Sequence, residues 1–300
     1  MSATIENPTA AAPATGYFRN PWRKPRVLQG VTIGYLLWSL LPVVIAVIFS
    51  FNGGRSRISW QGFSLRWWTQ DPTDSLLHDA AMRAAMAQTY KLAFLTVLVV
   101  VPLGTLFAIG IDRWHGRPAR AANFTMLLSF VVPEIILGVS LYILFTNLLQ
   151  GLVPLGTPAQ LLGLISFQLS YPVIIVRARL LSIGPEYEEA AMDLGAKPGQ
   201  AIRRELLPLI SPAILASVAL VFADVVDDFV TVAALSAEAN SETLAMKIYS
   251  ASRSSPTPEV NAAATMMLVT TLVVVSLGLL FYRRASRGQR DIATTDFMQL

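Results

Sequence analysis

The chain has no cysteine among its 300 residues, and it has few charged residues for its length. The lack of cysteine excludes a disulfide framework and a thiolate metal site, and no metal site is expected. Charged residues make up 14% of the chain, whereas soluble domains carry about 25%. Apolar residues reach 54%, and the mean hydropathy is +0.53. This composition indicates a protein whose solvent is largely a lipid bilayer.

Basic residues stand at the ends of apolar stretches rather than along one polar face. The pI of about 9.5 would suit a nucleic-acid-binding protein. However, arginine at the ends of apolar runs is typical of the flanks of membrane spans. No nucleic-acid partner is therefore expected, and the lipid bilayer is the first predicted partner.

Six apolar stretches are candidates for membrane spans, because about 20 apolar residues cross a hydrocarbon core of about 30 Å. They cover residues 31–51, 89–111, 124–149, 158–176, 210–223 and 262–282. The predicted fold is thus an all-α integral membrane protein with six transmembrane helices.

The distribution of Lys and Arg predicts the orientation. These residues crowd into the connections on the side of the N-terminus, for example Arg113, Arg117 and Arg120 after the second span, and are sparse on the other side. Because positively charged connections stay in the cytoplasm, both termini are predicted to lie there. The chain is therefore expected to have three parts: a cytoplasmic tail at residues 1–29, a six-span domain at residues 30–284 and a second cytoplasmic tail at residues 285–300.

Two connections on the outer side are unusual. Residues 52–88 contain Trp60, Trp67 and Trp68, which predicts an interfacial belt or a short helix lying on the membrane surface. Residues 224–259 are acidic and long for a turn between spans. We expect this second segment to fold partly back toward the membrane.

The connection at residues 182–208 is polar and charged between two apolar spans, and it predicts a helical hairpin in the cytoplasm. Pro185 suits the first helical position, where its missing N–H costs nothing. Gly195 suits the left-handed residue that ends a helix. A second helix is expected to begin at Pro198 and to end before Pro208. Glutamates fill the first turn of the first helix, where they interact well with the helix dipole; they are Glu186, Glu188 and Glu189.

The pattern alone leaves two interpretations of this hairpin open. Tyr187, Ala191 and Leu194 recur at helical spacing and form one narrow apolar face. Such a face can pack on the membrane surface. It can also fit into a groove of another protein as a docking element.

The hairpin resembles the EAA loop of binding-protein-dependent ABC importer permeases. That pattern is Glu-Ala-Ala, three residues, Gly, nine residues, an aliphatic residue, one more, then Leu-Pro. The matching residues are Glu189, Ala190, Ala191, Gly195, Leu207 and Pro208, and Glu205 stands at the aliphatic position. In that family the loop forms a coupling helix that sits in a cleft of the ATPase subunit. The resemblance implies this role for Glu188, Glu189, Ala190, Ala191, Asp193, Leu194 and Gly195.

The resemblance also implies the rest of an assembly. It implies a type I ABC importer transmembrane domain in a bacterial plasma (inner) membrane, a heterodimer with a second permease subunit, two ATPase subunits and an extracytoplasmic substrate-binding protein. The sequence has no glycine-rich loop ending in Gly-Lys-Ser or Gly-Lys-Thr, which ATPases use to hold phosphates. ATP and Mg²⁺ are therefore expected on the partner ATPase, and this chain is expected to hold no cofactor and to be no enzyme.

Four carboxylates are predicted to lie along a substrate pathway: Glu134, Asp224, Asp227 and Asp228. Glu134 follows Pro133, which breaks the helix inside the third span, and a charge at mid-bilayer costs about 2.5–3.5 kcal/mol on insertion scales. The aspartates cluster at the outer end of the fifth span. As alternatives, Glu134 bonds to a neighbouring helix, and the aspartates begin a solvated loop. Carboxylates along an uptake route favour a cationic substrate.

A second resemblance concerns the substrate. Several outer motifs look like those of the C-type permease subunits of spermidine/putrescine importers: Phe51-Asn52, residues 60–64, Asp227-Asp228, Leu244, residues 247–249 and residues 258–262. The similarity covers roughly residues 27–284. It implies polyamine uptake by alternating access. It also implies contacts with the binding protein for Lys247, Tyr249, Glu259 and Asn261.

Other functions stay open at this point. Importers of ferric iron, thiamine or aminoethylphosphonate are relatives that share some of the outer motifs, and ligand binding by the cognate binding protein would discriminate among them. An ion-coupled secondary transporter would use the intramembrane carboxylate as a relay and would work without an ATPase, but it leaves the hairpin at Glu189 unexplained. A membrane scaffold would tolerate neutralisation of every carboxylate.

Overall fold

The computed structural model describes residues 26–297 except residues 57, 115, 238 and 255–257. Apart from turns and bends these residues are helical, and their β pairing is limited to one isolated bridge between Asn52 and Phe63. Five helical stretches among them are long and apolar enough to cross a membrane, and a shorter apolar stretch covers Glu134–Leu148. The predicted all-α membrane fold is therefore confirmed.

The chain divides into two units, residues 1–45 and residues 46–300. In the first unit, α1 (Arg26–Phe49) exposes every side chain over residues 27–45. A helix that is apolar on all sides is typical of a membrane span, so the first predicted span is present and begins earlier than expected. Of the tail predicted at residues 1–29, residues 1–25 lie outside the described residues. Residues 26–29 belong to α1.

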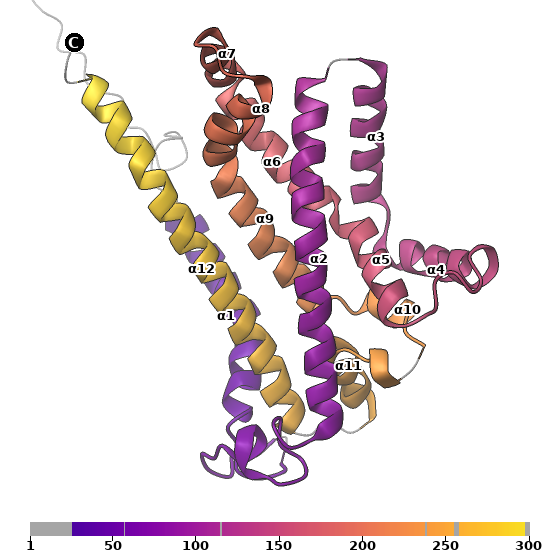
Figure 1. Cartoon of the computed structure of the whole chain (residues 1–300). Helices are drawn as coiled ribbons and strands as arrows, with labels where there is room; N and C mark the ends of the chain where they lie inside the picture. The colour runs from indigo at the N-terminus through magenta and orange to yellow at the C-terminus, as the bar shows by residue number, and fades with distance from the viewer. Residues whose placement is uncertain (1–25, 57, 115, 238, 255–257, 298–300) are drawn as a thin grey trace, which may run out of the picture. The chain divides into compact units, whose positions relative to one another are not determined.

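The second unit is built on three long helices, α2 (Ala80–Arg113), α9 (Leu207–Asp227) and α12 (Pro258–Phe297), as Figure 1 shows. The C-terminal tail predicted at residues 285–300 is helical as far as residue 297. The shorter helices are α3 (Arg117–Val131), α4 (Glu134–Ile143), α5 (Thr157–Gln168), α6 (Ser170–Ile183), α7 (Glu186–Asp193), α8 (Pro198–Ala201), α10 (Val230–Ala234) and α11 (Leu244–Ser254). Irregular helical turns are η1 (Arg66–Gln70), η2 (Leu144–Leu148), η3 (Ile202–Leu206) and η4 (Ala239–Ser241).

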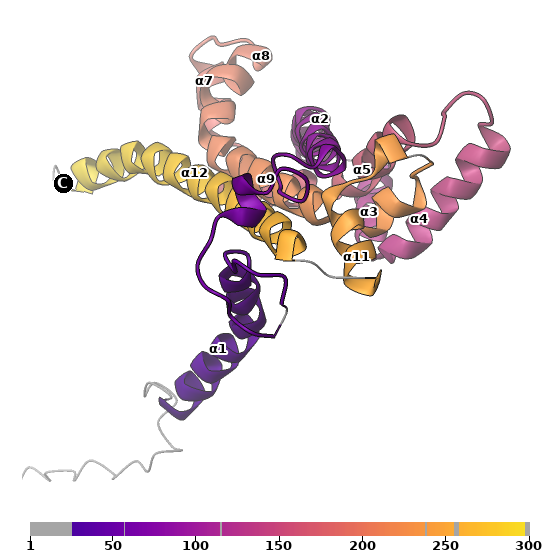
Figure 2. The same ribbon diagram turned by 90° about the horizontal axis from the view of Figure 1, so that it is seen from below.

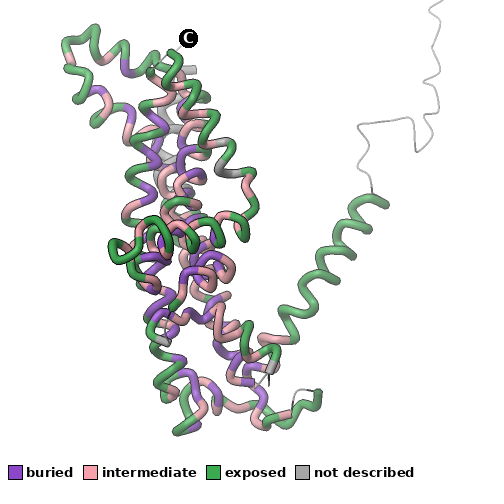
Figure 3. Tube along the Cα trace, turned by 90° about the vertical axis from the view of Figure 1, so that its right-hand side faces the viewer, coloured by how far each residue is buried: buried purple, intermediate pink, exposed green. Residues whose placement is uncertain are grey.

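The core of the second unit forms around α2, which packs against α5, α6, α9 and α11. Leu92 and Val100 of α2 meet Val225 of α9 in one buried cluster, and Figure 3 shows buried positions along the inner sides of the bundle. A side chain on Gly104 would collide with Pro172 of α6. In lipid, small residues of this kind stabilise helix pairs because they let the backbones approach closely.

The third predicted span, residues 124–149, is wrong as a single crossing. α3 ends at Val131, and Val132 and Pro133 are extended, with ψ values of 126° and 130°, before α4 begins. The break at Pro133 was expected, because proline has no N–H and disfavours a helical residue before it. The new finding is the change of direction, since α4 lies across α3 in both Figure 1 and Figure 2.

The fourth and fifth spans are longer than the sequence suggested. The fourth consists of α5 and α6, which together cover Thr157–Ile183, and the fifth is continuous over Pro198–Asp227. The prediction that the second hairpin helix ends before Pro208 is therefore wrong. In the π-helical turn η3, the N–H of Leu207 donates to the carbonyl of Ile202. Pro208 follows this turn as the second residue of α9, so the helical backbone runs through the proline instead of ending before it.

The segment after α9 folds back against the bundle, and one buried glutamine holds it there. Gln160 of α5 donates from Nε2 to the backbone oxygens of Val232 (3.0 Å) and Ser241 (2.8 Å). Its Oε1 accepts a hydrogen bond from Nε2 of Gln88 on α2 (2.9 Å). This network satisfies backbone groups that a returning segment would otherwise bury without partners.

The loop between α1 and α2 is anchored by tryptophan. The indole N–H of Trp67 donates to the backbone oxygen of Asn52 (2.7 Å), and that of Trp68 donates to Ser50 (3.2 Å). Trp67 is fully buried, whereas Trp60 is half exposed. The expectation of an interfacial belt is therefore wrong for Trp67. The alternative, a short helix, agrees with the helical turn η1, which contains Trp67 and Trp68.

Asp71 closes the same loop. Its carboxylate accepts hydrogen bonds from the backbone N–H groups of Asp74 (3.0 Å) and Thr73 (3.1 Å) and pairs with Arg66 (2.8 Å). These hydrogen bonds hold the pKa of Asp71 well below its usual value of 3.8. Because the folded-state pKa is depressed, this contribution to stability is complete above that usual value and is lost as the pH falls through the folded-state pKa.

We expect Gln160→Leu to lower the thermal stability of the chain. The variant keeps the volume of the side chain but leaves buried carbonyl groups without donors, which costs about 1–3 kcal/mol. Thermal unfolding in detergent would measure the loss, with Gln70→Leu as the control, because Gln70 is exposed in the outer loop. Equal melting temperatures for Gln160→Leu and the unmodified chain would contradict the proposed anchoring.

Candidate functional site

The hairpin predicted at residues 182–208 is present, and its first helix ends as expected. Gly195 has φ +91°, its N–H donates to Met192 (2.9 Å), and the N–H of Ala196 donates to Ala191 (3.0 Å). This pair of bonds is the Schellman motif, which favours glycine at the left-handed position. Pro185 directly precedes α7 instead of occupying its first position.

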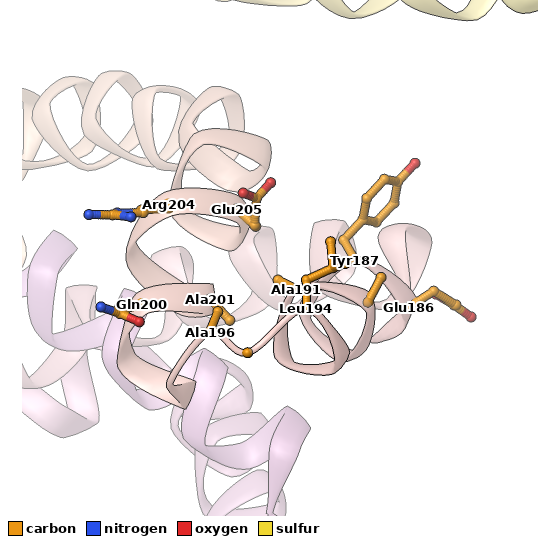
Figure 4. Close-up of a pocket in the computed structure, with 11 residues that line it drawn as sticks. Glu186, Tyr187, Ala191, Leu194, Ala196, Gln200, Ala201, Arg204 and Glu205 are labelled. Carbon is orange, nitrogen blue, oxygen red and sulfur yellow. The ribbon is translucent and has the colours of Figure 1, made fainter.

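A groove of about 770 Å³ separates the two halves of the hairpin. Figure 4 shows Tyr187 of α7 and Leu194, the residue after α7, on one side and Gln200 and Arg204 of α8 and η3 on the other. The side chain of Leu194 is 90% exposed. The predicted apolar face of α7 is therefore directed toward a groove that the described residues leave open.

The residues assigned to ATPase coupling divide into two groups. Six of them leave accessible surface on the hairpin: Glu189, Ala190, Ala191, Asp193, Leu194 and Gly195. Glu188 is buried, and it accepts hydrogen bonds from Nε (2.9 Å) and a terminal nitrogen of Arg113. The same guanidinium group also bonds Asp112 and the backbone oxygen of Gly184 (3.3 Å). Glu188 thus fixes α7 to the last residue of α2, and its side chain is only 9% exposed.

Two of the predicted pathway carboxylates meet at the start of α10. The hydroxyl of Thr231 donates to Oε1 of Glu134 (3.1 Å), and the N–H of Thr231 donates to Oδ1 of Asp228 (3.0 Å). The carboxyl groups of Glu134 and Asp228 are direct neighbours. Glu134 therefore bonds a neighbouring helix, which was one of the alternatives expected. The same residue of that helix, Thr231, also bonds the buried Asp228, so the two acids lie close together.

The other two aspartates lie around the same end of α9. Asp224 accepts a hydrogen bond from Nε2 of Gln168 (2.5 Å) and lies within electrostatic range of Glu134 and Asp227. Asp224 and the exposed Asp227 line a cavity of about 480 Å³ between α9, α11 and α12. None of the ion pairs between described residues includes Glu134, Asp224, Asp227 or Asp228.

Sequence reasoning missed two residues of this acidic cluster, Gln168 and Thr231. Gln168 is fully buried, and its Oε1 has no hydrogen-bond partner within the described part of the chain; the same holds for Oδ2 of Asp228. A polar residue inside a predicted span was a usable signal for Gln168. Thr231 gave no such signal, because its role depends on how the segment after α9 folds back.

The residues predicted to contact a binding protein lie on α11 and in the first turn of α12. Lys247 pairs with Glu242 (3.1 Å), and the ring of Tyr249 lies 4.2 Å from that of Phe229. Glu259 and Asn261 are half-buried at the start of α12. α11 and α12 contact each other, and Lys247 lies within electrostatic range of Glu259. Their contact with a binding protein stays a prediction.

Comparison with known proteins decides the family. Residues 100–291 match the family described as binding-protein-dependent transport system inner membrane component. The chain is 32% identical over 283 residues to the putrescine transport system permease protein PotI of Escherichia coli strain K12, which covers 91% of this chain and 95% of PotI. The chain belongs to this family of permeases. It is thus a multi-pass transmembrane subunit of an ABC importer.

Two further comparisons agree with this assignment. The spermidine/putrescine transport system permease protein PotC of the same strain is 33% identical over 248 residues, which covers 83% of this chain and 90% of PotC. A crystal structure of a bacterial ABC transporter that imports the acidic polysaccharide alginate superposes with a TM-score of 0.68. That likeness covers 86% of this chain and 96% of the other at 20% identity, and it supports the fold alone.

We expect Glu188→Gln to destabilise the hairpin and to weaken its attachment to α2. Removing one partner of a buried ion pair costs up to about 3–5 kcal/mol, and about 1–3 kcal/mol is expected here because the Arg113 side chain is 27% exposed. A double-mutant cycle with Arg113→Gln, read by thermal unfolding, would measure the coupling between the two residues. Additive losses would show that the contact contributes nothing.

Proposed function

We propose that this chain is the permease subunit through which an ATP-driven importer moves polyamines into the cell. It would work with a second permease subunit, two ATPase subunits and an extracytoplasmic binding protein, and both of its termini would lie in the cytoplasm. Relatives named for putrescine and for spermidine/putrescine transport share 32% and 33% identity with most of the chain. ATP and Mg²⁺ would bind to the ATPase subunits.

The acidic cluster carries the proposal of a cationic substrate. Four carboxylates gather at the end of α9 and the start of α4, and no basic side chain of the described chain pairs with them. Buried acceptors without donors cost about 1–3 kcal/mol each, and Gln168 Oε1 and Asp228 Oδ2 are two such atoms. The ammonium groups of a polyamine supply both positive charge and N–H donors. A polyamine therefore offsets the free-energy cost of burying unpaired carboxylates and acceptors without donors.

The exposed side of the hairpin supports docking of an ATPase. Leu194 is almost fully exposed, and the small residues Ala190, Ala191 and Gly195 line the adjoining groove. An exposed apolar tip with small flanking residues fits a groove on a partner. A surface packed against lipid headgroups would instead favour Lys and Arg around the apolar face, whereas α7 carries glutamates and aspartate.

Two rigid connections would carry movement from the hairpin to the acidic cluster. α9 begins beside the second half of the hairpin and ends at Asp227. A helix of this length spans about 30 Å. Arg113 joins α7 to α2, which packs against α9. Movement of the hairpin by the ATPase would therefore shift both helices together and expose the cluster alternately to the two sides of the membrane.

We expect Leu194→Asp to weaken the binding of the ATPase subunits about 10- to 100-fold, because a buried leucine side chain contributes about 1.5–3 kcal/mol. Copurification of the ATPase with the membrane subunits would measure the effect. Arg203→Ser is the control, since Arg203 is exposed on the same hairpin and does not line the groove. Undiminished copurification by Leu194→Asp would rule out docking at this tip.

We expect the complete complex in proteoliposomes to take up labelled putrescine or spermidine, and Glu134→Gln to reduce that uptake about 10- to 100-fold. The reason is the loss of a charge-assisted hydrogen bond worth about 1.5–3 kcal/mol. The complex should still assemble. Glu134→Asp retains the charge and should recover part of the uptake.

The outcomes separate cargo from mechanism. ATP-dependent uptake of iron, thiamine or a phosphonate in place of polyamines would leave the importer intact and overturn the cargo. Uptake at full rate without the ATPase subunits would overturn the coupling mechanism. Normal polyamine uptake by Glu134→Gln would remove Glu134 from the pathway.

A further inference from the structure

An apolar groove lies between α2 and α3 at the end of the bundle that carries the hairpin. It has a volume of about 400 Å³ and is lined by Leu103, Leu106 and Phe107 of α2 and by Pro118 and Ala122 of α3. Leu106 is 66% exposed. Small residues leave this space open. α3 contributes small side chains here, and Gly110 of α2 has no side chain to fill the space beside it, where a Cβ atom would meet nothing within 4 Å.

A basic cavity of about 460 Å³ adjoins this groove. Ile111, Trp114 and Ala119 line both, so the apolar and basic parts are continuous. The basic part is lined by Arg120 of α3 and Arg177 of α6. We name the combined space the α2–α3 groove.

The two arginines of the α2–α3 groove retain unused donors. A terminal nitrogen of Arg177 donates to Asn123, but its buried Nε has no acceptor within the described residues. Arg120 is exposed, and neither arginine takes part in an ion pair of the described chain. Asp112 also lines the cavity, but its carboxylate is held by Arg113. The site therefore favours an anionic acceptor such as a phosphate group.

We propose that the α2–α3 groove binds an anionic phospholipid of the leaflet that faces the hairpin. The guanidinium groups of Arg120 and Arg177 hold the phosphate, and one acyl chain lies in the apolar part. Free phosphate would leave the apolar part uncovered, whereas a lipid fills both. Trp114 is 68% exposed at the junction, as expected for an aromatic side chain at headgroup level. Basic pockets between spans on the cytoplasmic side bind anionic headgroups in the same way.

The test uses the intact transporter complex in nanodiscs of phosphatidylglycerol or phosphatidylcholine, followed by native mass spectrometry of retained lipid. We expect selective retention of phosphatidylglycerol. Arg120→Gln should reduce that selectivity about fivefold. Gly110→Leu should fill the apolar part and reduce the retention of phosphatidylglycerol. Arg203→Gln and Gly34→Leu are matched controls, since Arg203 is exposed outside the groove and a side chain on Gly34 also meets nothing within 4 Å.

Three outcomes would overturn the proposal. The first is equal retention of both lipids by the unmodified complex. The second is displacement of the bound lipid by inorganic phosphate alone, which would identify a soluble anion as the ligand. The third is unchanged retention of phosphatidylglycerol by the assembled Gly110→Leu complex, which would mean that no acyl chain occupies the apolar part; failure of this variant alone to assemble would mean that a helix of a partner subunit fills the groove. Because the readout is lipid retention, the result does not depend on the cargo.

Discussion

Inside a bilayer a polar group finds no water, so each buried backbone and side-chain group must be satisfied by the protein or its ligand. The second unit of this permease meets that requirement at its irregular points. Gln160 supplies donors to the carbonyls of the segment that folds back after α9. The π-helical turn η3 keeps the backbone helical up to Pro208. Several buried polar atoms stay without a partner within the described residues, and two of them, on Gln168 and Asp228, belong to the acidic cluster.

The same requirement relates the acidic cluster to the break at Pro133. Proline ends α3, α4 begins in a new direction, and Glu134 becomes the first residue of a helix. The N-terminus of a helix stabilises a negative charge, so the break reduces the cost of a carboxylate at this depth. It also brings Glu134 against Thr231, whose side chain and backbone bond two acids at once. The helix break at Pro133 and the segment that folds back after α9 therefore act together to hold the carboxylate of Glu134 in place.

Local chemistry in the sequence predicted the parts that depend on neighbouring residues. The end of α7 at Gly195 follows from the left-handed position that glycine favours, and the break at Pro133 follows from a missing N–H. The exposed groove of the hairpin agrees with the apolar face of Tyr187, Ala191 and Leu194. Contacts between residues far apart in the sequence could not be predicted from the sequence pattern. Glu188 looked like a surface residue, because nothing in its neighbourhood shows that Arg113, in another span, reaches it.

Other differences have the same origin. Pro208 looked like a helix end, since a π-helical turn before it leaves no pattern in the sequence. Trp67 looked like an interfacial residue, since its partner Asn52 lies across the loop. Family resemblance predicted ATPase contacts for the whole set of hairpin residues and could not single out Glu188, which anchors α7. The division between Glu188 and the accessible residues around it depends on the contact with Arg113 in another helix.

Arg113 connects the hairpin with the α2–α3 groove. Asp112 lines the α2–α3 groove and bonds Arg113, and Arg113 bonds Glu188 of α7. A phosphate held by Arg120 and Arg177 would share the cavity with Asp112 and would act on its negative charge. Lipid in the groove and ATPase on the hairpin would then act on one guanidinium group. By linkage, each would change the affinity of the other to the same extent, so the groove would tune coupling without touching the pathway.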